Sequence, residues 1–311
     1  MTKILVTGAG GFIGRHMVAA LGDRAIGIDM RQVDLRNRAG LIKQVQVAAP
    51  SAIVHLGART DLDGQSLADY AANTDGIANL IAAIDATPSV ERCLFVSSQL
   101  VCKTGYVPRD EHDTQPDTYY GESKVRGEMI VRGWKSDRVT WCLLRPTTIW
   151  GPGVSAHYQR FLRMIDRGRY VHVGRRPLYK SYGYVGNAVH QMRSFLSAAP
   201  DRIHGRTFYV ADYQPLSLRR WADTIQQELG APRIRTIPEN AARAVAIVGD
   251  VLNGAGWTTF PFNSFRLRNV LTEYQYDLRS TEEICGQLPY SMPEGVRTLV
   301  SWFRTLSANP M

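Results

Sequence analysis

The chain has 311 residues, of which 44% are hydrophobic and 21% are charged, so it is long enough for one large core or two modest domains. Its net charge of +9 suits a polyanion, a phosphorylated small molecule or an acidic surface, although the scattered arginines also fit an ordinary solvated surface. No apolar run reaches the roughly 20 residues that a membrane span needs.

Four cysteines, Cys93, Cys102, Cys142 and Cys285, lie far apart and form no CxxC pair. This spacing indicates neither a zinc site nor a disulfide framework. Residues 1–3 run straight into an apolar segment, so we expect no signal peptide. The sequence therefore predicts reduced thiols, no metal, a cytoplasmic location and no membrane partner.

Short apolar runs alternate with longer mixed stretches in the first half of the chain. Continuous runs of this length are typical of strands that are buried on both faces. Between the first two runs, Ile13, Met17 and Leu21 recur one helical turn apart, and Gly22 follows as a stop. This alternation predicts an α/β fold with a doubly wound parallel sheet. The runs are residues 4–6, 25–28, 52–56, 93–96 and 141–144.

The alternation weakens after residue 150. Glycine and proline cluster in RPTTIWGPG (145–153) and mark a turn. The remainder mixes a few helices with short strands such as 207–210, so we expect a smaller part built from several segments. The apolar stretch 241–257 is partly helical in period, and we expect it to pack in a core or a cleft rather than against a membrane.

A glycine-rich segment, VTGAGGFIG (6–14), follows the first strand and opens the first helix. Gly8, Gly11 and Gly14 have a TGxxGxxG spacing, which allows a tight turn and the close approach of a pyrophosphate. The helix N-terminus adds free N–H groups and the positive end of the helix dipole. In this strand–turn–helix context the motif predicts a dinucleotide site.

The second apolar run ends in Asp29. A carboxylate at this strand end can accept hydrogen bonds from both adenosine ribose hydroxyls and repels a 2′-phosphate, which favours NAD over NADP. Arg15 and Arg31 leave NADP open, because an arginine can host that phosphate. Asp34 and Leu35 follow closely and could border the adenine, with a solvated loop as the alternative for Asp34.

Three elements could meet over a bound nicotinamide. Ser97 and Ser98 close the fourth apolar run, and Tyr120 and Lys124 share one face of the helix that should follow. An ammonium beside a phenol lowers the phenol's pKa, so Tyr120 could act as a general base or acid near neutral pH. With a serine hydroxyl on the same substrate oxygen, the set predicts proton transfer at a carbinol coupled to hydride transfer.

Taken together, these motifs resemble the extended short-chain dehydrogenase/reductase family, and within it the NAD-dependent epimerase/dehydratase group that acts on nucleotide sugars. The resemblance covers nearly the whole chain. The matching segments are TGAGGFIG (7–14), Asp29, DL (34–35), HLGA (55–58), NTDGIANL (73–80), VSSQLV (96–101), YGESK (120–124), LRPTTIWGPG (144–153), YGYVGNAV (182–189) and SMPEGVRTLVSWF (291–303).

The resemblance implies a Rossmann NAD-binding domain in residues 1–150, to which some later segments return, and a smaller α/β domain in residues 151–311 that mainly binds substrate. It implies catalysis by Ser98, with Tyr120 as the base and Lys124 as its partner and a ribose ligand. The other implied cofactor contacts are Gly8, Gly11, Phe12, Ile13, Gly14, Asp29, Asp34, Leu35, Leu56, Gly57 and Ala58.

The implied substrate contacts are Ser98, Thr147, Thr148, Lys180 and Arg266, with Arg268 as the alternative to Arg266. A surface charge is the competing interpretation for each of these basic residues. The resemblance also implies that Asn73 is structural and suggests a homodimer, whereas nucleic acid is not an expected partner. Asn187 replaces the family's usual Asp, and we interpret it as a helix cap.

Two departures from the family narrow the reaction. Dehydratases of this group carry Asp-Glu after the catalytic hydroxyl, whereas this chain has Gln99 and Leu100, so 4,6-dehydration is not expected. The short stretch 29–34 is more common in 4-ketoreductases, which keeps that reaction open, but these enzymes usually prefer NADP(H) and Asp29 favours NAD. We expect an NAD-dependent nucleotide-sugar epimerase that acts at C4. The alternatives are an NAD(P)H-dependent 4-keto nucleotide-sugar reductase and a non-catalytic module that binds a dinucleotide or RNA.

Overall fold

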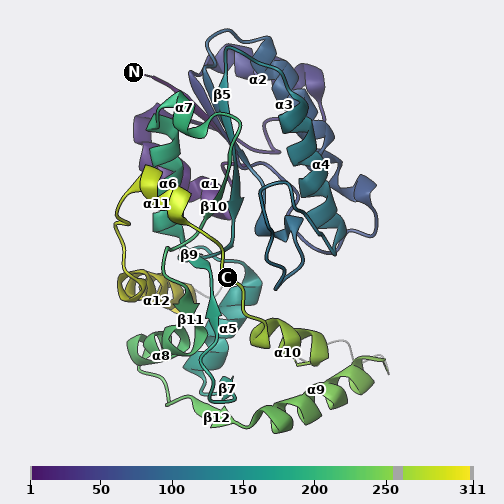
Figure 1. Ribbon diagram of the computed structural model, residues 1–311. Coiled ribbons are helices and arrows are strands. Elements are labelled where there is room, and N and C mark those ends of the chain that lie inside the picture. The colour runs from purple at the N-terminus through teal and green to yellow at the C-terminus, as the bar shows by residue number, and fades with distance from the viewer. Residues whose placement is uncertain (1, 255–261, 309–311) are drawn as a thin grey trace. The chain divides into compact units, whose positions relative to one another are not determined.

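The computed structural model describes residues 2–254 and 262–308, and these residues fall into two compact units (Figure 1). The first unit contains the described residues up to Trp150 together with Gly183–Tyr213 and Tyr276–Tyr290. The second contains Gly151–Tyr182, the described residues of Gln214–Gln275, and those from Ser291 onward.

A six-stranded sheet organises the first unit, and every neighbouring pair in it is parallel. The strand order is β10-β5-β4-β3-β1-β2. All five apolar runs of the first half fall on strands of this sheet, which confirms the predicted doubly wound α/β fold. The strands are β1 (Ile4–Thr7), β2 (Ala25–Ile28), β3 (Ala52–His55), β4 (Arg92–Val96), β5 (Thr140–Pro146) and β10 (Thr207–Val210).

Helices cover both faces of the sheet (Figure 1). Successive strand residues point to opposite faces, so Val6 joins the core beneath α1, α6 and α11, whereas Leu5 joins the core beneath α2, α3 and α4. The predicted stop at Gly22 is confirmed, because α1 ends at Leu21. The helices are α1 (Phe12–Leu21), α2 (Arg38–Ala48), α3 (Asp75–Asp85), α4 (Tyr119–Gly133), α6 (Val185–Ser197), α7 (Pro200–Ile203) and α11 (Arg279–Cys285).

The strand order reverses between β1 and β3, and ligands of doubly wound sheets bind at the carboxyl ends of the strands at such a reversal. Two glycines lie there in direct backbone contact. Gly8 follows β1 with a φ of +68°, and a Cβ placed on it would lie 2.7 Å from the backbone nitrogen of Gly57, which follows β3. Only glycine fits at position 8.

The second unit combines helices with short strand pairs. α8 packs against α5 and α12, and α9 packs against α10. β7 (Val171–Val173) pairs with β12 (Arg235–Ile237), and β8 (Tyr179–Lys180) pairs with β11 (Leu216–Ser217). A further short pair, β6 (Thr148–Trp150) with β9 (Tyr182–Tyr184), belongs to the first unit except for Tyr182. The helices are α5 (Ala156–Asp166), α8 (Leu218–Leu229), α9 (Glu239–Gly254), α10 (Ser264–Leu271) and α12 (Met292–Ala308).

The four cysteines are free and buried. Burial raises the pKa of the Cys285 thiol to about 12 and raises that of Cys93 well above its ordinary value, so these thiols remain protonated near neutral pH. Across the described ranges 2–254 and 262–308, no helix is long and apolar enough to cross a membrane.

Two local expectations are wrong. Asn187 does not cap α6, because Tyr184 occupies the N-cap position and the side chain of Asn187 donates instead to Asp212 Oδ1 at 2.8 Å and to the Tyr290 carbonyl oxygen at 2.9 Å. The Asp212 carboxylate accepts the Tyr184 N–H at 3.2 Å and so satisfies the helix end.

The second error concerns the apolar stretch 241–257. Ala242 and Ala246 of α9 are buried against Leu267 of α10, but the opposite side of the helix is exposed rather than packed in a core or cleft. Residues 255–257 lie outside the described residues.

Packing of α4 depends on a glycine, and this can be tested within one helix. A Cβ on Gly127 would lie 2.8 Å from the Asn73 carbonyl oxygen and 2.6 Å from Ile77 Cδ1, whereas a Cβ on Gly133 would meet nothing within 4 Å. Gly127→Ala should therefore lower the free energy of unfolding by about 1–3 kcal/mol. Gly133→Ala should leave it unchanged or raise it by up to about 1 kcal/mol, and equal effects in urea unfolding would contradict the packing.

Candidate active site

The turn between β1 and α1 consists of glycine and alanine up to Gly11, and Gly10 and Gly11 are exposed. The Gly11 N–H donates to the Gly8 carbonyl oxygen at 2.9 Å, and a Cβ on Gly14 would collide with that same oxygen. Gly11 is the N-cap of α1, and no side chain caps this helix end. Phe12 and Ile13 open the helix. The bare turn and helix N-terminus are therefore suited to a pyrophosphate.

Asp29 lies beside this turn. Its Oδ2 would be 2.7 Å from a Cβ on Gly10, and its Oδ1 accepts the Arg31 N–H at 2.8 Å. The Arg31 guanidinium is 3.7 Å from Oδ2 and 89% exposed, so this ion pair is weak. A carboxylate next to an uncovered phosphate turn suits an adenosine ribose, and the residues present therefore fit NAD.

The next predicted cofactor residues have defined partners. The Asp34 carboxylate pairs with Arg36 at 2.6 Å, and hydrogen bonds from Arg36 lower the pKa of Asp34. Leu35 packs toward the loop after β3, with its Cδ1 3.0 Å from the Cβ that Gly57 lacks. That loop, which includes Leu56 and Ala58, is held to β1 because the Gly57 N–H donates to Thr7 Oγ1 at 3.0 Å.

α4 sets the predicted catalytic pair on one face. The Thr118 hydroxyl accepts the Gly121 N–H at 3.0 Å and starts the helix, so that Tyr120 and Lys124 lie one turn apart. Both side chains are buried. The Lys124 ammonium donates to the Val96 carbonyl oxygen at 2.9 Å and lies 6.0 Å from the centre of the Tyr120 ring.

Ser98 joins this pair from the end of β4. A Cβ on Gly121 would collide with the Leu100 carbonyl oxygen, so the glycine lets α4 approach the segment that follows Ser98. Ser98 Oγ accepts the Leu100 N–H at 3.1 Å, and the Ser98 side chain lies close enough to Tyr120 to lower the pKa of its phenol in part. The structure thus brings the three predicted catalytic residues together.

The prediction that the Lys124 ammonium lowers the pKa of the Tyr120 phenol is wrong for the protein by itself. Burial raises the pKa of Tyr120 to about 12, and the Ser98 side chain opposes this shift only in part. Burial lowers the pKa of Lys124 to about 8. The ammonium faces the Val96 carbonyl oxygen, and desolvation outweighs any lowering of the phenol's pKa.

His55, which ends β3, has no role predicted from the sequence but belongs to this environment. Its Nδ1 lies 2.8 Å from Thr7 Oγ1, and its ring is buried. Burial, and then the charge of Lys124, lower the pKa of His55 to about 3. The imidazole is therefore neutral and places no second positive charge beside Lys124.

Asn73 ties the loop after β3 to α4. Its Oδ1 accepts the Arg59 N–H and its Nδ2 donates to the Arg59 carbonyl oxygen, each at 2.9 Å. The same Nδ2 lies 2.9 Å from Ser123 Oγ, which donates to the Tyr120 carbonyl oxygen at 2.7 Å. These contacts give Asn73 the structural role that the sequence implied.

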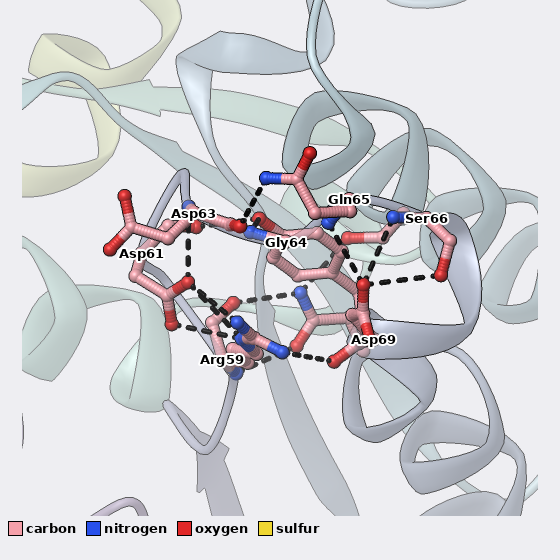
Figure 2. Close-up of polar contacts among 10 residues, drawn as sticks. Arg59, Asp61, Asp63, Gly64, Gln65, Ser66 and Asp69 are labelled. Carbon is pink, nitrogen blue, oxygen red and sulfur yellow. Dashed lines mark hydrogen bonds and ion pairs between the residues drawn. The ribbon is translucent and has the colours of Figure 1, made fainter. Parts of the chain in front are cut away.

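Tyr70 holds the loop that contains residues 59–69, and no sequence motif marked it. Its hydroxyl donates to the Asp61 carbonyl oxygen at 2.9 Å and accepts the Gly64 N–H at 3.1 Å. Arg59 pairs with Asp61 at 2.9 Å, as Figure 2 shows. The Arg59 guanidinium also lies 5.1 Å from the centre of the Tyr70 ring. The fully buried Tyr70 ring lies 6.1 Å from the Tyr120 ring and forms a wall beside it.

Two polar atoms next to Ser98 are buried without a hydrogen-bond partner in the described part of the chain. They are Ser97 Oγ and Gln99 Oε1. A buried polar atom without a partner is costly, so these atoms are suited to hydrogen bonds with a bound ligand.

The predicted substrate-binding residues differ in their burial and in their hydrogen-bond partners. Thr147 is buried, and its hydroxyl donates to the Val210 carbonyl oxygen at 3.4 Å, while Thr148 begins β6. Lys180 is buried in the second unit, where its ammonium donates to the Asn269 carbonyl oxygen. Such a contact favours a structural role for Lys180. Arg266 lies on α10, partly buried, with its N–H donating to Asn263 Oδ1 at 2.9 Å.

A buried ion pair fixes α4 against β5. Arg145 is fully buried and donates to both Glu128 oxygens at 2.9 and 2.7 Å. Glu128 continues the face of Tyr120 and Lys124 by one more turn. The four-residue spacing from Lys124 to Glu128 predicts that Glu128 shares this helix face, but it does not identify Arg145 on β5 as its partner.

Comparison with known proteins agrees with this geometry. Residues 4–211 match the model of the NAD dependent epimerase/dehydratase family, as the sequence motifs had indicated. An N-acetyl-alpha-D-glucosaminyl-diphospho-ditrans,octacis-undecaprenol 4-epimerase of Escherichia coli O157:H7 is 27% identical over 323 residues, which cover 96% of this chain and 94% of the relative.

Other similar proteins include reductases. A 2-alkyl-3-oxoalkanoate reductase of Stenotrophomonas maltophilia (strain K279a) is 24% identical, and the aligned residues cover 96% of this chain and 98% of the relative. The crystal structure of a Thermus thermophilus UDP-glucose 4-epimerase in complex with NAD aligns with a TM-score of 0.71 and 19% identity over 97% of this chain and 99% of that one. At this identity the structural likeness establishes the fold alone.

Asp29 can be tested as a cofactor residue. Asp29→Asn removes the charge that accepts ribose hydroxyls and repels a 2′-phosphate, so NAD affinity should fall about 10-fold or more while NADP affinity holds or rises. Calorimetric titration with each dinucleotide measures the NAD and NADP affinities. Asp23→Asn, a change at an exposed acid in the turn before β2, is the control. Equal losses for NAD and NADP in Asp29→Asn would contradict the assignment.

Proposed function

Because the chain belongs to the NAD-dependent epimerase/dehydratase family, we propose that it inverts C4 of a diphosphate-linked hexose, with nucleotide sugars as the substrate class. The observation that carries the proposal is the meeting of Ser98, Tyr120 and Lys124 at the carboxyl end of β4, on the same edge of the sheet as the glycine turn. The family's cofactor is NAD, and the turn and Asp29 are the residues that would hold it.

NAD, held by the glycine turn and Asp29, would supply reversible hydride transfer at the sugar carbon. Tyr120 takes the proton of the 4-hydroxyl and later gives it back to the 4-keto sugar oxygen. Ser98 donates a hydrogen bond to that oxygen. Since burial holds the pKa of Tyr120 near 12, the Lys124 ammonium is needed to stabilise the phenolate.

The residues after Ser98 argue against dehydration. Loss of water needs one group to remove a proton and another to protonate the departing hydroxyl. Leu100 has no titratable group, and the amide of Gln99 does neither at neutral pH. Gln99 Oε1 is instead a buried acceptor that suits a sugar hydroxyl.

Two of the similar proteins support a diphosphate as an element of the substrate. The Escherichia coli relative acts on a sugar joined through a diphosphate to undecaprenol, and the Thermus thermophilus neighbour is a UDP-glucose 4-epimerase. A net charge of +9 is consistent with such an anionic substrate. We propose that the second unit supplies the contacts that select the sugar and its carrier. A homodimer and a cytoplasmic location stay predictions.

A 4-keto sugar reductase is the second candidate, and the reductase among the relatives is the observation that favours it. The same three residues would act in one direction, with Tyr120 giving its proton to the keto oxygen. Steady consumption of NADH with a 4-keto-6-deoxy nucleotide sugar identifies the reductase, whereas conversion of a hexose without net change of cofactor identifies the epimerase.

The role of Tyr120 has a matched control in its neighbour Tyr119, which is exposed. In an epimerase, Tyr120→Phe should lower kcat by about 10²–10⁴-fold because it removes the transferred proton. Tyr119→Phe should leave kcat nearly unchanged. Product formation from UDP-, GDP- and dTDP-hexoses and a polyprenyl-diphosphate hexose is followed by NMR. Full activity of Tyr120→Phe, or no conversion of any sugar by the wild type, would refute the proposal.

A further inference from the structure

α9 is apolar around most of its circumference. At about 100° per residue, Ala242, Ala246 and Gly249 share one face, and this face is buried against α10. The charged residues Glu239, Arg243 and Asp250 occupy a narrow strip at its edge. The remaining face carries small and aliphatic side chains, all exposed: Ala241, Ala244, Val245, Ile247, Val248 and Val251.

This exposed face is larger than isolated apolar residues would explain. Ile247 is 60% exposed, Val248 54% and Val251 66%. Single exposed apolar side chains are normal on protein surfaces, whereas a continuous patch marks a site of contact. A helix that is apolar on both sides is expected to be covered on both.

Basic side chains border the face. A groove of about 390 Å³ between α9 and α10 is lined by Arg243 and Arg268 together with apolar side chains that include Ile247 and Leu271. Arg243 pairs with Glu239, but both side chains are exposed, so the pair is weak and open to exchange with another anion. Guanidinium groups at the edge of an aliphatic face are suited to phosphates.

The net charge of residues 231–271 also favours an anionic partner. Residues 231–271 contain five arginines and two acidic residues, a net charge of +3 within a chain of net charge +9. Arg233 and Arg235 precede α9 and are exposed. A second copy of this chain would set like charges against each other in a two-fold contact, whereas a surface of anionic lipid complements them.

We propose that α9 and α10 form a peripheral docking surface for a bilayer that carries anionic phospholipid headgroups. The side chains of Ile247, Val248 and Val251 enter the boundary between headgroups and acyl chains. Arg243 and Arg268, which line the groove beside Ile247, meet the phosphates. Such a helix lies in the plane of the interface, so the contact is with one leaflet. The proposal departs from the expectation that the chain has no membrane partner.

Vesicle sedimentation tests the proposal with the full-length protein and no substrate, so its outcome does not depend on the reaction. Vesicles of phosphatidylcholine alone are compared with equal parts of phosphatidylcholine and phosphatidylglycerol. The wild type should bind the anionic vesicles at least about 10-fold more tightly, and raised salt should weaken the binding. Val248→Glu should lower this affinity about 10-fold or more.

Val47→Glu is the matched control, because Val47 is an exposed valine on α2 of the first unit. It should bind vesicles like the wild type, and circular dichroism should show both variants folded. The proposal is overturned if the wild type stays in the supernatant, or if Val248→Glu and Val47→Glu bind alike. It is also overturned if light scattering shows that Val248→Glu only separates a dimer, since the face would then belong to a second copy.

Discussion

The hydrogen bond from the Lys124 ammonium to the Val96 carbonyl oxygen is the contact on which the candidate site depends. A buried ammonium is costly unless it is hydrogen-bonded, so α4 must seat Lys124 at the carboxyl end of β4. Gly121 allows that approach because a side chain there would collide with the Leu100 carbonyl oxygen. Asn73 then joins the loop after β3 to Ser123 on the same helix. The result is a preorganised group at the carboxyl end of β4, which neighbours β3 at the switch point of the sheet.

The burial that this packing requires also sets the charges of the site. It raises the pKa of Tyr120 to about 12, lowers that of Lys124 to about 8 and lowers that of His55 to about 3. Near neutral pH these three groups are therefore a phenol, an ammonium and a neutral imidazole. Among them Lys124 alone is charged, and the proposed chemistry relies on that charge to make the phenol a usable base.

Features with a local pattern were predictable from the sequence. Strands buried on both faces appear as apolar runs, the glycine turn has a fixed spacing, and Tyr120 and Lys124 are one helical turn apart. The contacts of Asn73 with Ser123 and of Thr7 with His55 join residues about 50 positions apart, and no spacing encodes them. The pKa of Tyr120 depends on burial, which only packing fixes. The periodicity of α9 likewise shows an apolar helix without showing which face is covered.

The most direct test of the central claim uses a nucleotide hexose that carries deuterium at C4, incubated with the NAD-loaded protein. The hydride should leave and return within one active site, so the 4-epimer should keep its deuterium, with no exchange with solvent protons and no reduced cofactor released. Product in which C4 has lost its deuterium to solvent, or deuterium that accumulates in free NADH, would contradict reversible oxidation at this carbon. NMR of the product at C4 distinguishes these outcomes.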